Sequence, residues 1–169
     1  MSRSAWMLIN YIQQSLLLPN RIRTAFLRRM GVDMHPSANI ASGVFIGSNS
    51  IHLAQDVVIN IHCFLDGCES ISFGQHVRLG PYVKILTGSH TINTGVLRRA
   101  GTSTEINLPV EIHRGAWIGM GAIILPGVTI AEGCVIGAGS VVVHSTQPNG
   151  LYVGNPAKRI RDLPVTANP

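Results

Sequence analysis

An aliphatic residue recurs at every sixth position through the second half of this 169-residue chain. A period of six matches neither the roughly 3.6 residues of a helical turn nor the two-residue alternation of a plain strand. It is typical of a short strand and a sharp turn repeated along a solenoid, in which stacked coils bury one another's apolar residues. The aliphatic residues of this series are Ile112, Ile118, Ile124, Ile130, Ile136 and Val142.

The other positions of these hexads support a tightly turned coil. Glycine recurs at the fourth position, which suits turns that need a positive φ. The fifth position is small or of modest size and is expected to point inward, where space is limited. The glycines are Gly121, Gly127, Gly133 and Gly139, and the fifth residues are Ala122, Val128, Cys134 and Ser140.

The same six-residue period occurs earlier in the chain. Its first block contains Ile40, Ile46, His52, Val58 and Phe64, and its second contains Phe73, Leu79 and Ile85. Phe73 follows Phe64 by nine residues, which indicates about three inserted residues. Ile112 follows Ile85 by 27 residues, which is not a multiple of six, so a loop leaves the pattern over about residues 91–108. We expect roughly four to five stacked layers, at three hexads to a layer.

The sequence therefore predicts an all-β solenoid of hexapeptide repeats with short N-terminal helices and one protruding loop. Ile22, Phe26 and Met30 lie at i, i+4 and i+8, on one face of a helix. A second amphipathic helix is expected from about Ser4 to Leu17, and both would cover the open end of the solenoid. The expected organisation is a helical cap over residues 1–33, a β-helix over 34–157 with the loop at about 91–108, and a tail over 158–169.

The net charge of +5 is concentrated at the two ends of the chain. Residues 1–31 contain five arginines and no acidic residue, and no basic stripe interleaved with aromatic residues occurs, so no nucleic-acid partner is expected. Two interpretations of the N-terminal arginines stay open: solvated charge, or peripheral contact of residues 1–30 with an anionic membrane.

Three cysteines, Cys63, Cys68 and Cys134, have no C-x-x-C spacing, which fits a reducing compartment. The apolar run of residues 5–18 is too short and too polar to span a bilayer, and no small-residue cleavage site follows it. The expected location is cytoplasmic, with or without attachment to the inner face of the membrane.

The hexads IGMGAI, ILPGVT, IAEGCV and IGAGSV and the closing GNPAKRIR, Gly154 to Arg161, resemble those of the hexapeptide-repeat acyltransferases. Within that family, FLDGCESISFGQHVRLGPYVKILTGSH is most similar to sugar O-acetyltransferases of surface-polysaccharide biosynthesis, and more distantly to maltose and galactoside O-acetyltransferases. The resemblance implies a left-handed parallel β-helix and a homotrimer with active sites between adjacent subunits. It also implies acetyl-CoA as acyl donor and a sugar or glycan as acceptor.

His90, in the stretch TGSHTIN, ends a hexad at the point where the loop begins. This position puts an imidazole on the surface beside a flap, where it can accept a hydroxyl proton near neutral pH. A lone surface histidine is not by itself specific for catalysis. The resemblance identifies TGSH as the motif whose histidine is the general base.

Asn60 and Asp66 are the next catalytic candidates. Asn60 ends VVIN and matches an active-site asparagine of the maltose and galactoside enzymes, where an amide donor assists the tetrahedral intermediate. The alternative for Asn60 is one rung of an internal amide ladder. Asp66, in FLDG, could orient His90 or bind a sugar hydroxyl, and its alternative is a turn-forming residue before Gly67.

Trp117, in GAWIG, is expected to face outward because it directly precedes an inward Ile118. The resemblance places it by the acceptor pocket, where a ring can stack on a sugar, and packing under the flap is the alternative. Arg98, Arg99 and Glu105 on the loop are further acceptor contacts, with a solvated flap as the alternative.

For acetyl-CoA, the resemblance implies a groove along the glycine-rich rungs near Met120 and Ala138. Lys158 and Arg161 match basic residues that contact the nucleotide end, and cationic side chains there suit its phosphates. Relatives often have Thr-Lys where this chain has Val143 and His144, so no role is assigned to these two residues.

No catalytic metal is expected. Some β-helix proteins bind zinc through two histidines five residues apart, but Gly95 occupies that offset from His90. Of the other histidines, His52 takes an aliphatic hexad position and is expected in the core. His62 is assigned to a fifth hexad position and His76 to a fourth.

The predicted activity is acetyl transfer from acetyl-CoA to a sugar hydroxyl in polysaccharide biosynthesis, by direct attack with His90 as base. One alternative is N- or O-acetylation of an amino sugar or a small amino acid such as serine. Another is a non-catalytic trimeric β-helix scaffold.

Overall fold

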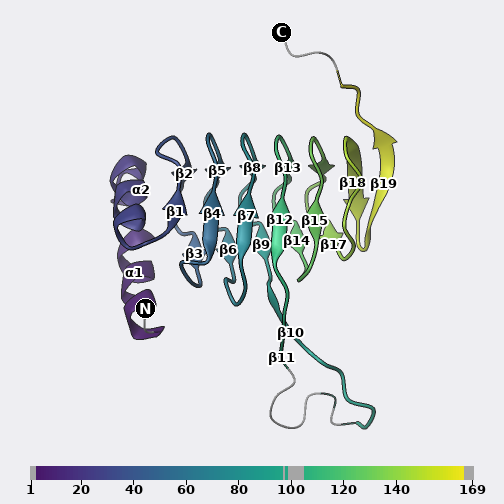
Figure 1. Cartoon of the computed structure of the whole chain (residues 1–169), viewed down its shortest axis with the longest axis horizontal. Helices are drawn as coiled ribbons and strands as arrows, with labels where there is room; N and C mark the ends of the chain where they lie inside the picture. Colours follow the sequence, from purple (N-terminus) through teal and green to yellow (C-terminus); the bar gives the residue numbers. More distant parts are fainter. Residues whose placement is uncertain (1–2, 97, 99–104, 166–169) are drawn as a thin grey trace.

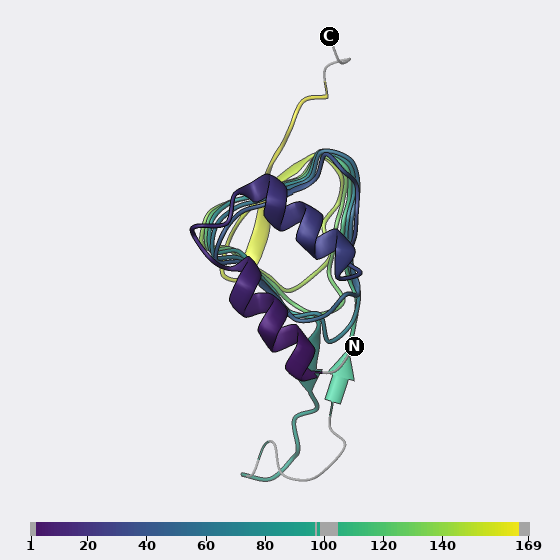
Figure 2. The ribbon, with the colours of Figure 1, turned by 90° about the vertical axis from the view of Figure 1, so that its left-hand side faces the viewer.

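The computed structural model of the chain is a prism of stacked coils, with two helices across its N-terminal end and a hairpin projecting from one side (Figure 1). The structure describes residues 3–96, 98 and 105–165. Viewed along the axis, the coils superpose into a triangular outline (Figure 2). This architecture confirms the predicted all-β solenoid with short N-terminal helices and one protruding loop.

Each coil contributes one short strand to each of three parallel sheets. Five coils contribute a strand to all three sheets. The first sheet contains β1 (Asp33–Met34), β4 (Ile51–Leu53), β7 (Ile71–Phe73), β12 (Val110–Ile112) and β15 (Thr129–Ile130). The second contains β2 (Asn39–Ile40), β5 (Val58–Ile59), β8 (Arg78–Leu79), β13 (Trp117–Ile118), β16 (Val135–Ile136) and β18 (Gly150–Gly154). The third contains β3 (Phe45–Ile46), β6 (Phe64–Leu65), β9 (Lys84–Ile85), β14 (Ile123–Ile124) and β17 (Val141–Val142).

A last strand, β19 (Ala157–Asp162), pairs antiparallel with β18 and ends the second sheet. Residues 158–169 were expected to form a tail. The described part of that segment, up to residue 165, therefore includes a hydrogen-bonded strand.

The hexads of the second half pack as predicted. The aliphatic residue of each hexad from Ile112 to Val142 is at most 1% exposed, and the fifth residues are also buried. Gly121, Gly127, Gly133 and Gly139 have φ of +69°, +79°, +66° and +69°. Side chains other than glycine are strained in this region, so the recurring glycine follows from the backbone of the turn.

The predicted register is wrong between residues 52 and 64. The inward residues there are Leu53, Ile59 and Leu65, one position later than predicted. One extra residue enters between Ile46 and Leu53, so two extra residues, rather than three, precede Phe73. A one-residue slip exchanges inward and outward side chains.

The corrected register changes the environment of two histidines. His52 is exposed rather than buried, and its Nδ1 lies 3.0 Å from Oδ2 of Asp33. His62 occupies a fourth position rather than a fifth and has φ of +57°, while His76 keeps its predicted fourth position with φ of +60°. The turn that takes glycine in later coils is thus occupied by histidine in these two.

Helices α1 (Arg3–Gln13) and α2 (Asn20–Arg29) cover the open end of the first coil (Figure 2). The first helix ends four residues before the expected Leu17. Its buried side packs on the solenoid, where the Asn10 side-chain amide donates to the carbonyl oxygen of Ile46 at 2.8 Å. No helix in the described part of the chain is long and apolar enough to cross a membrane.

Candidate active site

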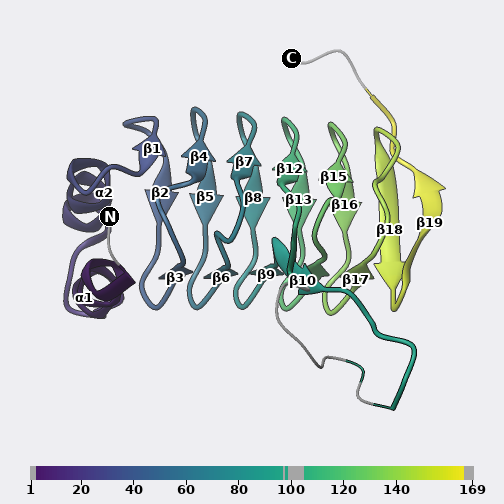
Figure 3. The same cartoon turned by 60° about the horizontal axis from the view of Figure 1, so that its bottom comes forward.

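The loop that interrupts the repeat begins as a two-stranded hairpin. Strand β10 (Gly88–His90) pairs antiparallel with β11 (Glu105–Asn107), which places His90 opposite Glu105. The hairpin leaves the solenoid after β9, at the corner between the third and first sheets, and projects sideways (Figure 3). The excursion therefore starts at Gly88, three residues before the expected boundary. We call this corner the hairpin corner.

Asp66 holds the base of the hairpin. It follows β6 and lies one coil before Thr87 at the same corner. Its Oδ2 accepts hydrogen bonds from the backbone amides of Thr87 at 3.1 Å and Gly88 at 2.9 Å, and from the Thr87 hydroxyl at 3.4 Å. A Cβ at Gly88 would lie 3.3 Å from this oxygen and 3.0 Å from Sγ of Cys68, so glycine permits this close approach. Asp66 thereby positions the strand that carries His90.

A pocket of about 270 Å³ opens between the hairpin and the corner beneath it. Asp66 and His90 both line it, so the structure brings these two predicted residues together. Glu105, an expected acceptor contact, also lines it. Cys68, Ser89 and Asn107 were not predicted as site residues. Only the strand pairing of β10 with β11 places Asn107 there.

An apolar groove of about 580 Å³ adjoins this pocket and shares Asp66 and Cys68 with it. Its floor includes the rings of Phe45 and Phe64, which stack with centroids 4.8 Å apart and planes 7° from parallel. Trp6 of α1 also lines it. The six-residue pattern did not predict this groove, because Phe64 was expected on the inward side.

A second group of predicted residues follows the corner between the second and third sheets. Asn60 comes after β5, Met120 after β13 and Ala138 after β16. Backbone bonds connect successive coils here, since the amide of Gly139 donates to the carbonyl oxygen of Met120 at 2.8 Å. Oδ1 of Asn60 accepts a hydrogen bond from the backbone amide of Ile61 at 2.8 Å, so this oxygen stabilises the turn in which Asn60 lies. We call this corner the rung corner.

The remaining predicted residues lie on the second sheet or on the hairpin loop. Trp117 on β13 is 57% exposed and faces outward, as predicted. Lys158 and Arg161 are exposed on β19. Arg98 is exposed, and its guanidinium donates to the carbonyl oxygens of Asn93 and Thr94 at 3.2 and 3.3 Å. Arg99 lies outside the described residues.

The predicted site is therefore divided within one chain. His90 and Asp66 belong to the hairpin corner, whereas Asn60, Met120 and Ala138 belong to the rung corner. These are different corners of the triangular outline (Figure 2). A single chain does not bring the two groups together.

The buried Cys63 thiol is poorly suited to nucleophilic chemistry. Burial raises the pKa of the Cys63 thiol to about 11, and its Sγ donates to the carbonyl oxygen of Gly80 at 3.2 Å. A thiol held neutral in this way is a poor nucleophile. Among the described residues, no group of three or more His, Cys, Asp or Glu side chains could hold a metal ion.

Comparison with known proteins identifies the class of this chain. The family described as bacterial transferase hexapeptide (six repeats) matches residues 109–144. A galactoside O-acetyltransferase of Lactococcus lactis is 34% identical over 110 residues, which cover 65% of this chain and 52% of the relative. The matched region spans between 52% and 60% of the length of the first curated relatives.

Solved structures match over nearly the whole chain. A maltose O-acetyltransferase from Clostridium difficile 630 has a TM-score of 0.81 and 32% identity, covering 96% of this chain and 87% of that one. A hexapeptide-repeat-containing acetyltransferase of Vibrio cholerae, solved in complex with acetyl coenzyme A, has a TM-score of 0.79 and 28% identity over the same shares.

The coils, the repeat and these matches define a hexapeptide-repeat protein with a left-handed parallel β-helix, as predicted. This chain belongs to the hexapeptide-repeat transferase family.

Proposed function

We propose that this protein is an acetyl-CoA-dependent O-acetyltransferase that acetylates a sugar hydroxyl in polysaccharide biosynthesis. The observation that carries the proposal is the pocket that His90 and Asp66 share at the base of the hairpin. The likeness to a maltose O-acetyltransferase supports a sugar acceptor. The complex of the Vibrio cholerae relative with acetyl coenzyme A supports the donor.

In the proposed reaction, His90 accepts the proton of the acceptor hydroxyl while that oxygen attacks the thioester carbonyl. The new C–O bond gives a tetrahedral intermediate, whose collapse breaks the C–S bond. The coenzyme A sulfur leaves and takes the proton from the imidazolium. Asp66 contributes by fixing the backbone at Thr87 and Gly88, three and two residues before the base.

Asn60 would stabilise the oxyanion of this intermediate through its side-chain NH₂ group. The division of the site between two corners implies that Asn60 comes from a neighbouring copy. A closed homotrimer repeats one such contact three times and leaves no site unfilled. The rung corner of one subunit would then face the hairpin corner of the next.

The acetyl-CoA arm would follow the rung corner past Met120 and Ala138, and its phosphates would meet Lys158 and Arg161. Trp117 and Arg98 would contact the acceptor, with Trp117 stacking on a sugar ring. The groove over Phe45 and Phe64 extends the acceptor pocket toward α1. The protein would act in the cytoplasm.

Replacing His90 by Ala tests the proposal. Turnover of acetyl-CoA with a panel of nucleotide sugars, lipid-linked oligosaccharides and free sugars should fall about 10²- to 10⁴-fold, whereas acetyl-CoA affinity measured by calorimetry should be unchanged. His52→Ala is the matched control, because His52 is an exposed histidine on the first sheet. Undiminished turnover would refute the general base, and preferred acetylation of an amino sugar or serine would replace the acceptor. Failure of the wild-type protein to bind acetyl-CoA would favour the scaffold.

A further inference from the structure

The outer side of the helical cap carries an exposed apolar surface. The buried side of α1 contains Trp6, Ile9 and Asn10, so the opposite side faces away from the solenoid. Six apolar side chains of α1, the following turn and α2 are between 55% and 93% exposed. We call them the apolar end surface, and they are Met7, Leu8, Tyr11, Leu16, Leu17 and Ile22.

Single exposed apolar residues are ordinary, but a group of six at one end of a molecule is typical of an interaction surface. Tyr11 and Leu17 border one shallow groove with Ile12, Ser15 and Leu18, so the helix and the turn form a continuous surface. The two helices lie side by side across the end of the solenoid (Figure 1, Figure 2).

Arg23 holds the turn that carries the two most exposed leucines. Its side chain is fully buried, and its guanidinium donates to the carbonyl oxygens of Gln13, Ser15 and Leu18 at 2.6, 2.7 and 2.7 Å. These acceptors lie on both sides of Leu16 and Leu17 in sequence. The leucines, 78% and 93% exposed, are therefore held outward by a buried network.

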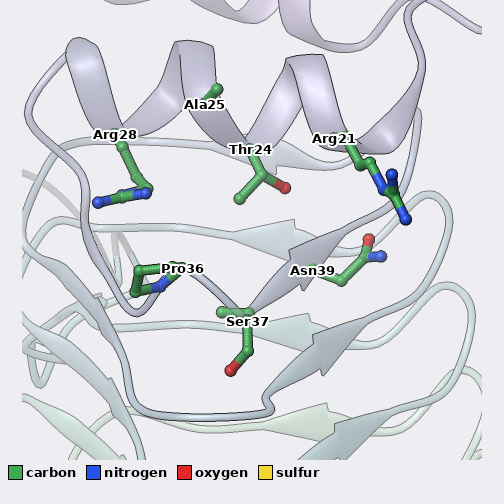
Figure 4. Close-up of a pocket in the computed structure, with 8 residues that line it drawn as sticks. Arg21, Thr24, Ala25, Arg28, Pro36, Ser37 and Asn39 are labelled. Carbon is green, nitrogen blue, oxygen red and sulfur yellow. The ribbon is translucent and has the colours of Figure 1, made fainter.

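Basic side chains lie on α2, the second helix of the same cap. Arg21, Arg28 and Arg29 of α2 are exposed, and the chain has no acidic residue before Asp33. Arg21 and Arg28 line a groove of about 340 Å³ between α2 and the first coil. Figure 4 shows them extending from the helix, with Ser37 and Asn39 across from them. Guanidinium groups are well suited to phosphate oxygens.

We infer that the apolar end surface and its arginines dock the solenoid end-on to an anionic lipid surface. The leucines and aromatic ring would enter the boundary of the acyl chains, and the arginines would bind lipid phosphates. Docking of a second copy end to end would instead bring two sets of arginines together, and neither helix of the cap has an acidic residue to pair with them. Charge complementarity therefore favours lipid over a second copy, and the helices would lie on the bilayer rather than cross it.

Flotation of the full chain with lipid vesicles tests this inference. The protein should float with vesicles that contain phosphatidylglycerol, much less with pure phosphatidylcholine, and less as salt concentration rises. Leu16→Ser with Leu17→Ser should weaken binding about tenfold or more, because the apolar contribution is removed. Arg21→Gln with Arg28→Gln should weaken binding to anionic vesicles roughly fivefold for each arginine.

Val165→Ser is the matched control, since Val165 is 74% exposed near the opposite end of the chain. It should leave vesicle binding unchanged. Thermal denaturation should show that the leucine variant keeps the wild-type stability, and acetyl transfer to a water-soluble acceptor should be unaffected. The latter measurement separates failure of lipid docking from failure of the proposed activity.

Three outcomes would overturn the inference. The wild-type protein could float equally with neutral and anionic vesicles, or with neither. The leucine variant could bind vesicles as tightly as the wild type. Analytical ultracentrifugation could show that the leucine variant has lost an association present in the wild type, which would assign the surface to contact between copies.

Discussion

The carboxylate of Asp66 accepts a hydrogen bond from the backbone amide of Gly88 at 2.9 Å, two residues before His90. The two residues are 22 positions apart in sequence but lie on successive coils of the same corner. This bond joins the regular solenoid to the hairpin that carries the proposed base. Loss of the Asp66 carboxylate should therefore disturb the position of His90.

Asp66→Ala should increase hydrogen exchange at the amides of Thr87 and Gly88 and lower kcat for acetyl transfer. Two amides lose a charged acceptor, a loss of about 1.5–3 kcal/mol for each such bond. Asp66→Asn keeps an acceptor oxygen and should recover part of both properties. Glu69→Gln is the control, because the Glu69 carboxylate is exposed and accepts from Ser70 at the same corner. Unchanged exchange in Asp66→Ala would show that the hairpin does not depend on this carboxylate.

Two inactive variants should restore activity when their subunits are mixed. The proposed site takes His90 from one subunit and Asn60 from its neighbour, so each variant supplies the group that the other lacks. A mixed trimer of His90→Ala and Asn60→Ala subunits pairs an intact His90 with an intact Asn60 at one of its three interfaces, so about a third of the sites should be complete. The measurement is kcat per subunit of differently tagged, co-expressed chains purified through both tags.

Separately purified variants, mixed without subunit exchange, are the control and should stay inactive. If co-expressed chains assemble but gain no activity, the two residues do not share a site between subunits.

Gly119→Ala should destabilise the protein more than Gly121→Ala, although the glycines are neighbours on one turn. A Cβ at Gly119 would lie 2.6 Å from the backbone nitrogen of Ala138 in the next coil, and backbone cannot easily move aside. Gly121 has open space for a Cβ, but its φ is +69°, so alanine there costs about 1–2 kcal/mol of strain. Urea denaturation of both variants measures the difference. Equal losses would mean that the coils can separate locally at Ala138.

The stability of the protein should decline between about pH 9 and pH 11 because of Cys63. Burial raises the pKa of this thiol from 9.0 to about 11, so the unfolded chain releases its proton first as pH rises. The stability that the neutral thiol contributes is complete below pH 9 and is lost as pH rises toward 11. Cys63→Ala should flatten the slope of the unfolding free energy across this window, measured by urea denaturation at several pH values.

Cys68→Ala is the control for this slope, because Cys68 is exposed. In the folded wild type, iodoacetamide at pH 8 should modify Cys68 well before Cys63. A slope that is identical in Cys63→Ala and the wild type would assign the decline to other groups.

The six-residue period by itself predicted the solenoid, its inward positions after Ile112 and the glycine turns. The physical reason is that each hexad repeats one backbone conformation, so the same positions require an inward apolar side chain or a glycine in every hexad. Ile118 and Gly121 could be assigned an inward side chain and a positive φ from sequence alone, and both assignments are correct. The point at which the repeat stops also located His90 beside the protruding loop.

Tertiary structure decided the register of the repeat wherever two adjacent residues were both apolar and either could have faced inward. Val58 and Ile59, like Phe64 and Leu65, are adjacent apolar residues, so hydrophobicity could not say which of each pair faces inward. Packing against the neighbouring coils selected Ile59 and Leu65 and turned Phe64 outward to stack on Phe45. That choice formed the groove beside Asp66.

The bond between Asp66 and Gly88, and the separation of His90 from Asn60, likewise depend on which corner each residue occupies. A period in the sequence specifies the shape of a coil. One or two inserted residues shift every later side chain to another position on the coil. Only packing against neighbouring coils determines where the inserted residues lie.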